Sequence, residues 1–294
     1  MTEAAAEAYR RRFRRVLEHI DQHLEDDIGV DALGIVAGFS KFHFHRQFSE
    51  LLGIGVYKYV QLVRLKRAAY QLAFRNQERI IDIALVSGYE SHEAFSRAFK
   101  RIVGQTPSEF RERPQWGAWH EIVQPLNEVR SQHMKPDNRA ENVSIVDFNP
   151  TRVGVLEHRG DPARLEESIR TFIEWRKQNN LHPRVSATFN LFYGDPAQTA
   201  PEEFRLDLCA ATERPIGDNP FGVVERTIPG GRCAVLRHIG SDDTLGDTLK
   251  YLYGTWLPAS GEEPRDFPLY AQRVSMFPDV PEHEAVTDVF LPLR

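Results

Sequence analysis

The sequence predicts an α+β chain of two domains: an all-α double helix-turn-helix domain followed by a pseudo-symmetric (ββαββ)2 domain. Three observations carry this prediction. A short helical pattern occurs twice, 51 residues apart, within the first 113 residues. From Val143 onward the apolar residues tend to alternate with polar ones, which is typical of strands. Within that second half another pattern recurs 80 residues apart. A chain of 294 residues is long enough for two such domains.

The first repeated pattern predicts two copies of one helical unit. Five matched pairs share its offset: Ser40/Ser91, Phe44/Phe95, Arg46/Arg97, Phe48/Phe99 and Gly53/Gly104. Each copy predicts a helix, a tight turn at Gly38 or Gly88, and a second helix that Ser40 or Ser91 can cap. This is the arrangement with which proteins insert a helix into the major groove of DNA. The repeat therefore favours DNA binding.

The second helix of each copy is expected to contact DNA with the side that carries no buried phenylalanine. The residues expected there are Lys41, Phe42, His45, Arg46, His92, Glu93, Ser96 and Arg97. Arginine can donate two hydrogen bonds to guanine, and an exposed aromatic ring can contact a thymine methyl group. Core packing is the alternative for Phe42, and stabilisation of the helix dipole is the alternative for Glu93. For His45 and Arg46 the alternative is a solvated surface.

A continuous helical pattern over residues 56–75 connects the two copies. Twenty residues at ~1.5 Å each span ~30 Å, and one turn of DNA is ~34 Å long. One subunit is therefore expected to place two recognition helices in successive major grooves. Because this needs no two-fold symmetry, a monomer is expected.

The net charge of −5 is unusual for a DNA-binding protein until it is divided along the chain. Residues 41–113 carry 13 Lys and Arg against 7 Asp and Glu, whereas residues 117–294 carry 19 against 27. The positive charge thus surrounds the helical repeat, as phosphate binding requires.

The composition changes again after the repeat. Residues 114–141 contain Trp116 and Trp119 followed by a polar stretch, which favours an extended linker. The two tryptophans are expected to pack on one of the domains. The predicted boundaries are 8–113 for the helix-turn-helix domain, 114–141 for the linker and 142–294 for the second domain.

The second half predicts the order β-β-α-β-β twice. Residues 143–148 and 152–158 are expected to be paired strands, and the motif from Arg152 to Gly160 recurs from Arg232 to Gly240. Two such units usually leave a cleft at their junction, where ligands bind. The residues expected to line it are Trp175, Phe192, Tyr193, Trp256, Tyr270 and Arg273. For each aromatic residue, core packing is the alternative.

Catalytic residues, metals and cofactors are not expected. The sequence has no G-x-S-x-G motif, and Cys209 and Cys233 lack metal-ligand spacing. His158 and His238 occupy equivalent strand positions and are expected to pack at the strand ends or form hydrogen bonds rather than bind metal. Unpaired thiols indicate the reducing cytoplasm. Neither a signal peptide nor a stretch of ~20 apolar residues is present, so no membrane partner is expected.

The first half resembles the DNA-binding domain of the AraC/XylS family over about residues 8–113. The similar segments are Gly38-Phe-Ser-Lys-Phe-His-Phe-His-Arg-Gln-Phe, Arg64-Leu-Lys-Arg-Ala, Ile81-Asp-Ile-Ala and Ser91-His-Glu-Ala-Phe-Ser-Arg-Ala-Phe-Lys. The N-terminal position of this domain resembles the Rob subgroup. The resemblance implies base contacts on both recognition helices, RNA polymerase as a partner, and activation. Relatives often have Trp and Gln where this chain has Phe42 and His45, so the operator is not implied.

The second half resembles the gyrase-inhibitor-like effector-binding domain over about residues 143–294. The similar segments are Tyr193-Gly-Asp-Pro, Gly230-Gly-Arg-Cys-Ala-Val, Trp256-Leu-Pro, Pro281-Glu-His-Glu and Thr287-Asp-Val-Phe-Leu-Pro-Leu. The resemblance implies a small-molecule effector. Members that bind cationic, lipophilic drugs use a glutamate on the penultimate strand, and here that place is Ala271, near Arg273. A neutral or anionic ligand is therefore equally open.

Together these features predict a sequence-specific, DNA-binding transcription regulator, expected to be an activator, that a small molecule controls through the second domain. Two alternatives belong to other classes. One is a small-molecule hydrolase or binding domain tethered to DNA. The other is an architectural DNA-binding protein whose C-terminal domain binds a protein partner.

Overall fold

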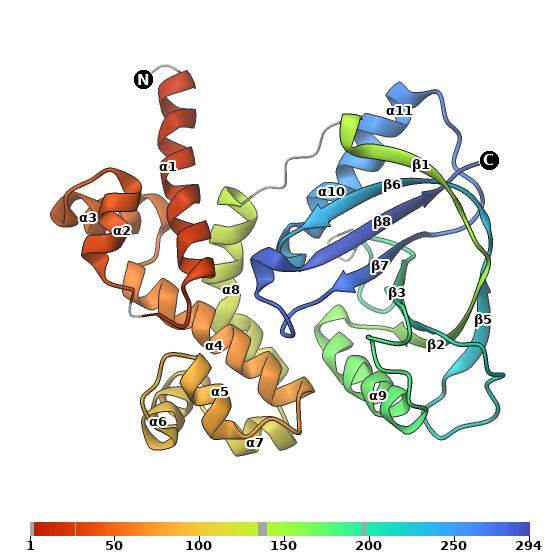
Figure 1. Ribbon diagram of the computed structural model, residues 1–294, viewed down its shortest axis with the longest axis horizontal. Coiled ribbons are helices and arrows are strands. Elements are labelled where there is room, and N and C mark those ends of the chain that lie inside the picture. The colour runs from red at the N-terminus through yellow and green to blue at the C-terminus, as the bar shows by residue number, and fades with distance from the viewer. Residues whose placement is uncertain (1–2, 27, 135–139, 196–197) are drawn as a thin grey trace. The chain divides into compact units, whose positions relative to one another are not determined.

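The computed structural model describes residues 3–26, 28–134, 140–195 and 198–294 (Figure 1). It divides into two compact units. The helical unit holds the described residues up to Met134, together with two short segments from the C-terminal half, Ser241–Thr244 and Phe277–His283. The sheet unit holds the other described residues. The α+β prediction of a helical domain followed by a (ββαββ)2 domain is confirmed.

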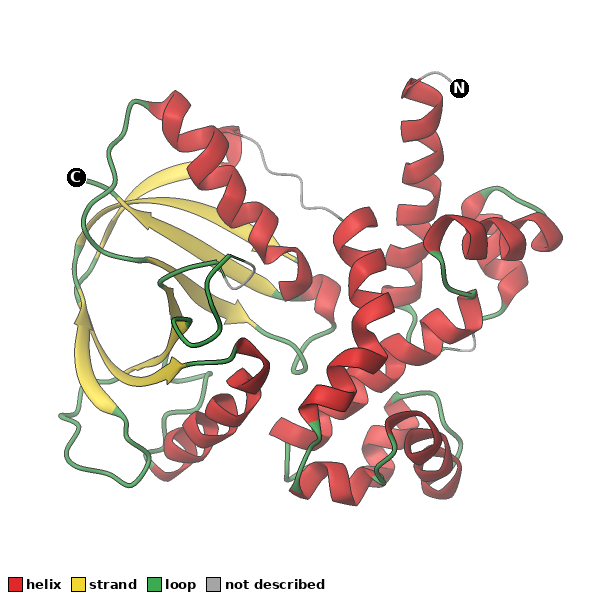
Figure 2. Cartoon of the chain, turned by 180° about the vertical axis from the view of Figure 1, so that it is seen from behind, coloured by secondary structure: helices red, strands yellow, loops and turns green. Residues whose placement is uncertain are grey.

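The helical unit contains eight α-helices among its described residues, joined by short loops (Figure 2). They are α1 (Glu3–Gln22), α2 (Val30–Ala37), α3 (Lys41–Leu52), α4 (Val56–Phe74), α5 (Ile80–Val86), α6 (His92–Val103), α7 (Pro107–Glu112) and α8 (Trp116–His133). The two helix-turn-helix motifs are α2–α3 and α5–α6. Gly38 and Gly88 form their turns with φ of +72° and +77°, a left-handed conformation that glycine adopts without a steric penalty.

Helix α4 connects the two motifs, as the sequence predicts, and its apolar side is buried. Leu62 and Val63 pack into one core with residues of α1, α2, α3 and α8. Arg64 of the same helix donates hydrogen bonds to the carbonyl oxygens of Leu24 and Asp26, just beyond the end of α1. Helix α4 is therefore fixed by both apolar packing and polar contacts.

The expectation of an extended linker over residues 114–141 is wrong for Trp116–His133, which form helix α8. Its buried residues recur at helical spacing: Trp116, Trp119, Val123, Leu126 and Val129. The Trp116 ring stacks on Phe74 at 5.7 Å and lies 5.5 Å from Phe110. The two tryptophans thus pack on the helical domain, and this apolar stripe gives the segment a reason to be helical.

The sheet unit is built on one antiparallel sheet of eight strands in the order β1-β6-β8-β7-β3-β4-β2-β5. The strands are β1 (Val143–Phe148), β2 (Thr151–Arg159), β3 (Thr188–Phe192), β4 (Arg205–Ala211), β5 (Val224–Ile228), β6 (Gly231–Ile239), β7 (Leu269–Ser275) and β8 (Val286–Pro292). Helix α9 (Leu165–Gln178) belongs to the first repeat. Helices α10 (Leu245–Tyr251) and α11 (Leu257–Ser260), joined by the π-helical turn Leu252–Trp256, belong to the second.

The expected pairing of residues 143–148 with residues 152–158 is wrong. Strand β1 instead pairs with β6 of the second repeat, and β5 of the second repeat pairs with β2 of the first. The connections are Asn149-Pro150 and Pro229-Gly230, and a β-carbon on Gly230 would lie 2.7 Å from the Pro150 ring. Each connection contains a proline, which cannot donate a ladder hydrogen bond. The two repeats thus exchange their edge strands.

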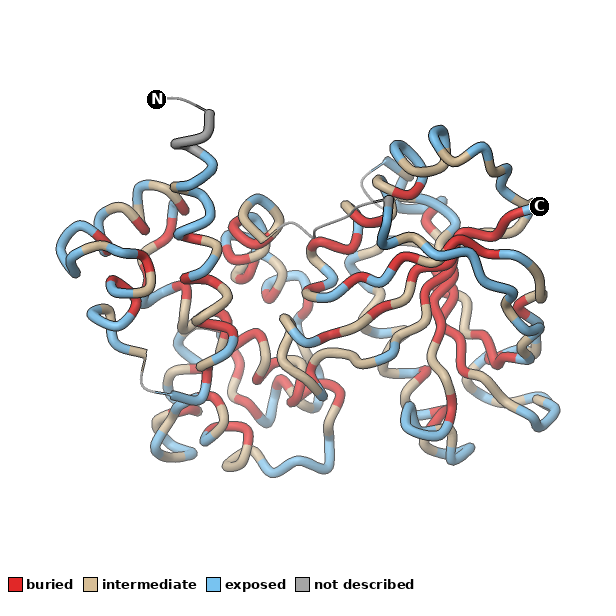
Figure 3. Tube along the Cα trace, turned by 45° about the horizontal axis from the view of Figure 1, so that its top comes forward, coloured by how far each residue is buried: buried red, intermediate tan, exposed pale blue. Residues whose placement is uncertain are grey.

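The sheet has two differently packed sides. On one side, Trp175 and Phe172 of α9 cover Leu206 and Leu208, while Leu245 and Leu252 of the α10 segment pack on the second repeat. The buried cluster on the other side contains residues from strands alone, including Phe189, Tyr270 and Phe290. Figure 3 shows the buried positions concentrated along the central strands. No helix among the described residues is long and apolar enough to cross a membrane.

Candidate nucleic-acid interface and effector site

Each recognition helix is anchored by a pair of phenylalanines. Phe44 and Phe48 of α3 are fully buried, and so are Phe95 and Phe99 of α6. Residues four apart lie on one side of a helix, so each pair fixes which side of its helix faces outward. The repeated phenylalanine spacing in the sequence therefore has the same structural role in both motifs.

Helix α3 presents its predicted DNA-contacting residues to solvent. Lys41, His45 and Arg46 are exposed, and the Phe42 side chain is 78% exposed. The Lys41 ammonium lies 5.5 Å from the centre of the Phe42 ring, and the His45 ring lies 6.3 Å from that of Tyr57. Core packing is therefore excluded for Phe42. The surface combines positive charge with an exposed aromatic ring, both of which suit a DNA groove.

Helix α6 presents a similar but more polar surface. His92, Glu93 and Arg97 are exposed, and Ser96 is half-buried. A hydrogen bond from its own backbone N–H, and then one from the Ser91 hydroxyl, lower the pKa of Glu93. The carboxylate is thus held at the N-terminus of α6, where the helix dipole stabilises negative charge. This contact supports a structural role for Glu93, while a contact with cytosine stays a prediction.

The connecting helix α4 has 19 residues and a length of about 28 Å at about 1.5 Å per residue. This is close to the ~34 Å that separates equivalent points of successive major grooves. Both motifs pack against this helix, α3 and α5 directly. One largely buried helix therefore connects the two recognition surfaces.

The six predicted effector-site residues fall on two sides of the sheet. Trp175 and Trp256 pack in the α9 and α10 clusters, and Phe192 packs against both clusters. Arg273 lies two residues after Ala271 and four after Leu269 on β7, both of them buried, and therefore shares their side of the sheet. Its guanidinium donates to Asn190 Oδ1 at 2.8 Å and to Thr287 Oγ1 at 3.2 Å. These four residues belong to the helix-covered side, where the repeats meet at Phe192.

Tyr270 and Tyr193 belong to the other side. Tyr270 stacks on Phe290 at 4.9 Å, inside the strand-only cluster. Tyr193 donates its hydroxyl hydrogen to Asp207 Oδ2 at 2.8 Å, and the Arg205 guanidinium lies 4.0 Å from its ring centre. Burial and the Asp207 carboxylate raise the pKa of Tyr193.

The polar partners of these residues were not predicted from the sequence. Arg205 and Asp207 share one side of β4, and Asn190 lies opposite Ala271 on the neighbouring strand. Period-two alternation in β4 could have indicated Arg205 and Asp207. The pairing of β3 with β7, which brings Asn190 to Arg273, connects the two repeats and has no local sequence signal.

The equivalent histidines join each strand to the helix of its own repeat. His158 Nδ1 lies 2.9 Å from Ser168 Oγ, and His238 Nδ1 lies 2.9 Å from Thr248 Oγ1. Both hydroxyl residues follow their histidine by ten positions, so the 80-residue repeat includes this hydrogen bond. The prediction that these histidines form hydrogen bonds is confirmed.

The two cysteines are buried and differ from reactive thiols. Burial raises the pKa of the Cys209 thiol well above its usual range, and burial also raises that of Cys233. Both side chains therefore stay protonated and are poor nucleophiles at neutral pH. Among the described residues, no group of three or more His, Cys, Asp and Glu side chains is placed to hold a metal ion.

The sequence of the second half matches a known protein family. A family described as the GyrI-like small molecule binding domain matches residues 141–294, more than half of the chain. The chain belongs to this GyrI-like family. A second family, described as a helix-turn-helix domain, matches residues 33–113. The AraC-type arrangement followed by a GyrI-like domain is that of a transcription regulator.

Three curated relatives illustrate the two parts of the match. The probable transcriptional regulator YgiV of Escherichia coli K12 is 42% identical over 153 residues, which cover 52% of this chain and 96% of YgiV. The uncharacterized regulator YbfP of Bacillus subtilis is 40% identical over 103 residues, or 35% of either chain. The right origin-binding protein of Escherichia coli K12 is 34% identical over 106 residues, or 36% of either chain. The last two matches thus span about a third of those relatives.

Proposed function

We propose that this GyrI-like regulator binds an asymmetric operator by placing α3 and α6 in two successive major grooves. One observation carries the proposal: two exposed recognition surfaces are held by a single buried helix of 19 residues. The eight predicted contact residues, Lys41, Phe42, His45, Arg46, His92, Glu93, Ser96 and Arg97, are all on α3 or α6. One subunit then suffices, and the regulator binds DNA as a monomer.

Selection of bound duplexes from random DNA, followed by hydroxyl-radical footprinting, tests this proposal. We expect two protected segments on one face of the duplex, separated by about one helical turn of 10 to 10.5 base pairs. Analytical ultracentrifugation of the complex should show one protein chain on each duplex. A single protected half-site of about 5 base pairs, or two chains on each duplex, would contradict it.

We propose further that a small molecule binds the GyrI-like domain on its helix-covered side. Phe192 contacts the clusters of both repeats there. On the same side of the sheet, Arg273 donates hydrogen bonds to Asn190 and Thr287. Ala271 takes the place of the glutamate that the drug-binding members use, so this surface suits a neutral or anionic ligand better than a cation. A ligand controls the regulator only if it binds the active and inactive states unequally.

A thermal-shift screen with neutral, anionic and cationic compounds tests the ligand class. Hits should be neutral or anionic, and Arg273→Ala should weaken their binding. Each hit is then titrated into the regulator bound to its selected duplex and into a transcription assay with purified RNA polymerase. We expect DNA affinity or transcript yield to change, with transcription increased by the active form. Hits that bind without changing either quantity would favour an architectural protein.

A further inference from the structure

Five ionisable side chains form a buried charge cluster inside the helical unit: Asp21 of α1, Lys66 of α4, Arg130 of α8, Asp243 and Glu282. Lys66 Nζ lies 2.8 Å from Asp243 Oδ2 and 2.9 Å from Glu282 Oε1. Arg130 donates two hydrogen bonds of 2.9 Å to the two oxygens of Asp21. Its Nη2 also lies 3.4 Å from Glu282 Oε2. One connected network therefore joins three helices to two acids of the C-terminal half.

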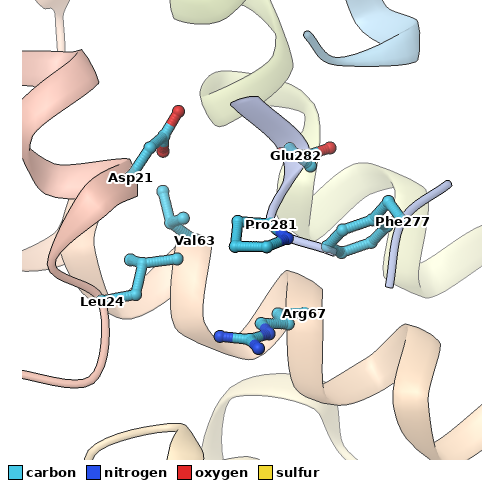
Figure 4. Close-up of a pocket in the computed structure, with 7 residues that line it drawn as sticks. All are labelled: Asp21, Leu24, Val63, Arg67, Phe277, Pro281 and Glu282. Carbon is cyan, nitrogen blue, oxygen red and sulfur yellow. The ribbon is translucent and has the colours of Figure 1, made fainter. Parts of the chain in front are cut away.

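The cluster is shielded from water. The side chains of Lys66 and Arg130 are only 6% and 2% exposed. Asp21 and Glu282 also border a small pocket with Leu24, Val63 and Pro281 (Figure 4). The pocket holds about 10 Å³, which is room for about one water molecule, so it is not an effector site. Removing the partners of a buried charge is strongly unfavourable, so these side chains depend on one another.

Lys66 and Asp243 hold each other in their charged forms at neutral pH. Burial lowers the pKa of Lys66, but the Glu282 and Asp243 carboxylates outweigh it and raise that pKa above its usual range. Burial raises the pKa of Asp243, but Lys66, Arg130 and the Ser241 hydroxyl together outweigh it and the pKa is lowered. The cluster is thus a set of ion pairs.

Asp243 and Glu282 both lie in short connections between elements of the GyrI-like domain. Asp243 lies in the turn between β6 and α10, and Glu282 lies in the connection between β7 and β8. The Ser241 hydroxyl lies 3.0 Å from both Asp243 Oδ2 and Glu282 Oε1, so it joins the two segments. The partners of Lys66 are therefore continuous in the chain with β6, α10, β7 and β8.

The first repeat provides an internal comparison. The 80-residue offset that relates His158 to His238 places Ala163 at the position equivalent to Asp243. The turn after β2 therefore lacks the acid that binds Lys66. The repeats share the strand histidine and its hydrogen bond to the helix, but Asp243 is specific to the second repeat. Maintenance of the fold that the two repeats share does not explain the presence of Asp243.

We propose that the charge cluster couples the GyrI-like domain to the DNA-binding helices. Rearrangement of the second repeat would move Asp243 and Glu282 relative to Lys66 and so shift α4, which sets the spacing of the recognition helices. The inference rests on the proposed function, because it assigns the route by which effector and DNA influence each other. Such coupling is reciprocal, so DNA binding must alter the second repeat.

Reciprocity allows a test in which the selected DNA duplex is the probe. Hydrogen exchange is followed by mass spectrometry in α10 and β8, with and without the duplex. In the native chain we expect DNA to change exchange in these elements by about fivefold or more, and in Asp243→Asn/Glu282→Gln by less than about twofold. These substitutions keep side-chain size, and circular dichroism checks the fold. If the double variant does not fold, Asp243→Asn alone takes its place.

Asp288→Asn is the matched control. Asp288 is another acid of the second repeat, and it pairs with Arg237 rather than with the cluster. This variant should keep the native response to DNA. A change in hydrogen exchange that persists in the double variant would overturn the coupling but not the DNA binding. The same holds if the native chain binds the duplex without any change in exchange. A failure to select any duplex would instead contradict the proposed function, and the inference with it.

Discussion

At the scale of single residues, position on the helix decides the role of chemically identical side chains. Phe42 and Phe44 are two residues apart on α3, yet the first is exposed and the second is fully buried. Ser40 and Ser91 occupy equivalent N-cap positions, but only Ser91 accepts a hydrogen bond, from the Ala94 backbone N–H at 3.1 Å. The two copies are thus similar in packing and different in polar detail.

The two phenylalanines give a matched pair of variants. Phe42→Ala should change the free energy of unfolding by no more than about 0.5 kcal/mol, because the ring is exposed, but should weaken binding to the selected duplex. Phe44→Ala should reduce the free energy of unfolding by about 3–5 kcal/mol, because it leaves a cavity in the core. Denaturant titration and electrophoretic mobility shifts measure the two quantities. Unchanged DNA affinity in Phe42→Ala would contradict the assignment of this ring to the interface.

The ion pairs of the charge cluster predict a pH dependence. The lowered pKa of Asp243 contributes stability above the unfolded value of about 3.9, and this is lost as the pH falls through the folded value. The raised pKa of Lys66 contributes stability below about 10.4, which is lost only at higher pH. The difference in unfolding free energy between the native chain and Lys66→Met should be largest at neutral pH and shrink as the pH falls, because without Lys66 burial raises the pKa of Asp243 and its protonation removes the unpaired charge. A difference that stays constant down to about pH 3 would contradict this.

At the scale of elements, connections between distant parts of the chain were harder to predict than the elements themselves. The period of apolar residues indicated α4, but the polar stretch after Trp119 concealed α8. The alternation of apolar residues indicated β1 and β5, while their exchange between repeats depends on pairing across the whole sheet. Local sequence determines whether a segment forms a helix or a strand. The strand with which it pairs depends on residues in distant parts of the chain.

Helix α8 should be essential for the stability of the helical unit. Trp119 is fully buried, and its ring lies 5.9 Å from Phe110 of α7. Trp119→Ala should therefore reduce the free energy of unfolding by about 3–5 kcal/mol. Gln124→Ala, at an exposed position of the same helix, should change it by no more than about 0.5 kcal/mol. Equal effects of the two variants in denaturant titration would argue against this packing role.

At the scale of the whole molecule, two different internal repeats serve two functions. The helix-turn-helix copies stay separate and are spaced by α4. The ββαββ copies instead merge into one sheet through exchanged edge strands and the β3–β7 pair. The proposed binding to two successive major grooves needs two surfaces at a fixed distance, whereas the proposed effector site lies where the two repeats meet.

The fixed length of α4 predicts a strict requirement for operator spacing. Insertion of five base pairs between the two protected segments rotates the second by about half a turn of DNA, out of reach of α6. Affinity should fall to that of one half-site, a loss of about 100-fold or more. Substitution of the same spacer bases without a change in length is the control. Retained affinity for the longer operator in mobility-shift titrations would show that α4 does not fix the spacing.

The sequence by itself determined the two-domain fold class, both helix-turn-helix motifs, the connecting helix and the hydrogen-bonding histidines. These features depend on periodicity and on short offsets, which local residues specify. Only the tertiary structure decided the strand exchange, the two sides on which the effector candidates lie, and the charge cluster. Lys66 did interrupt an apolar helical pattern, which marks a buried charge. Its partner Asp243, however, is 177 residues away, and no local pattern specifies a contact between residues so far apart in the chain.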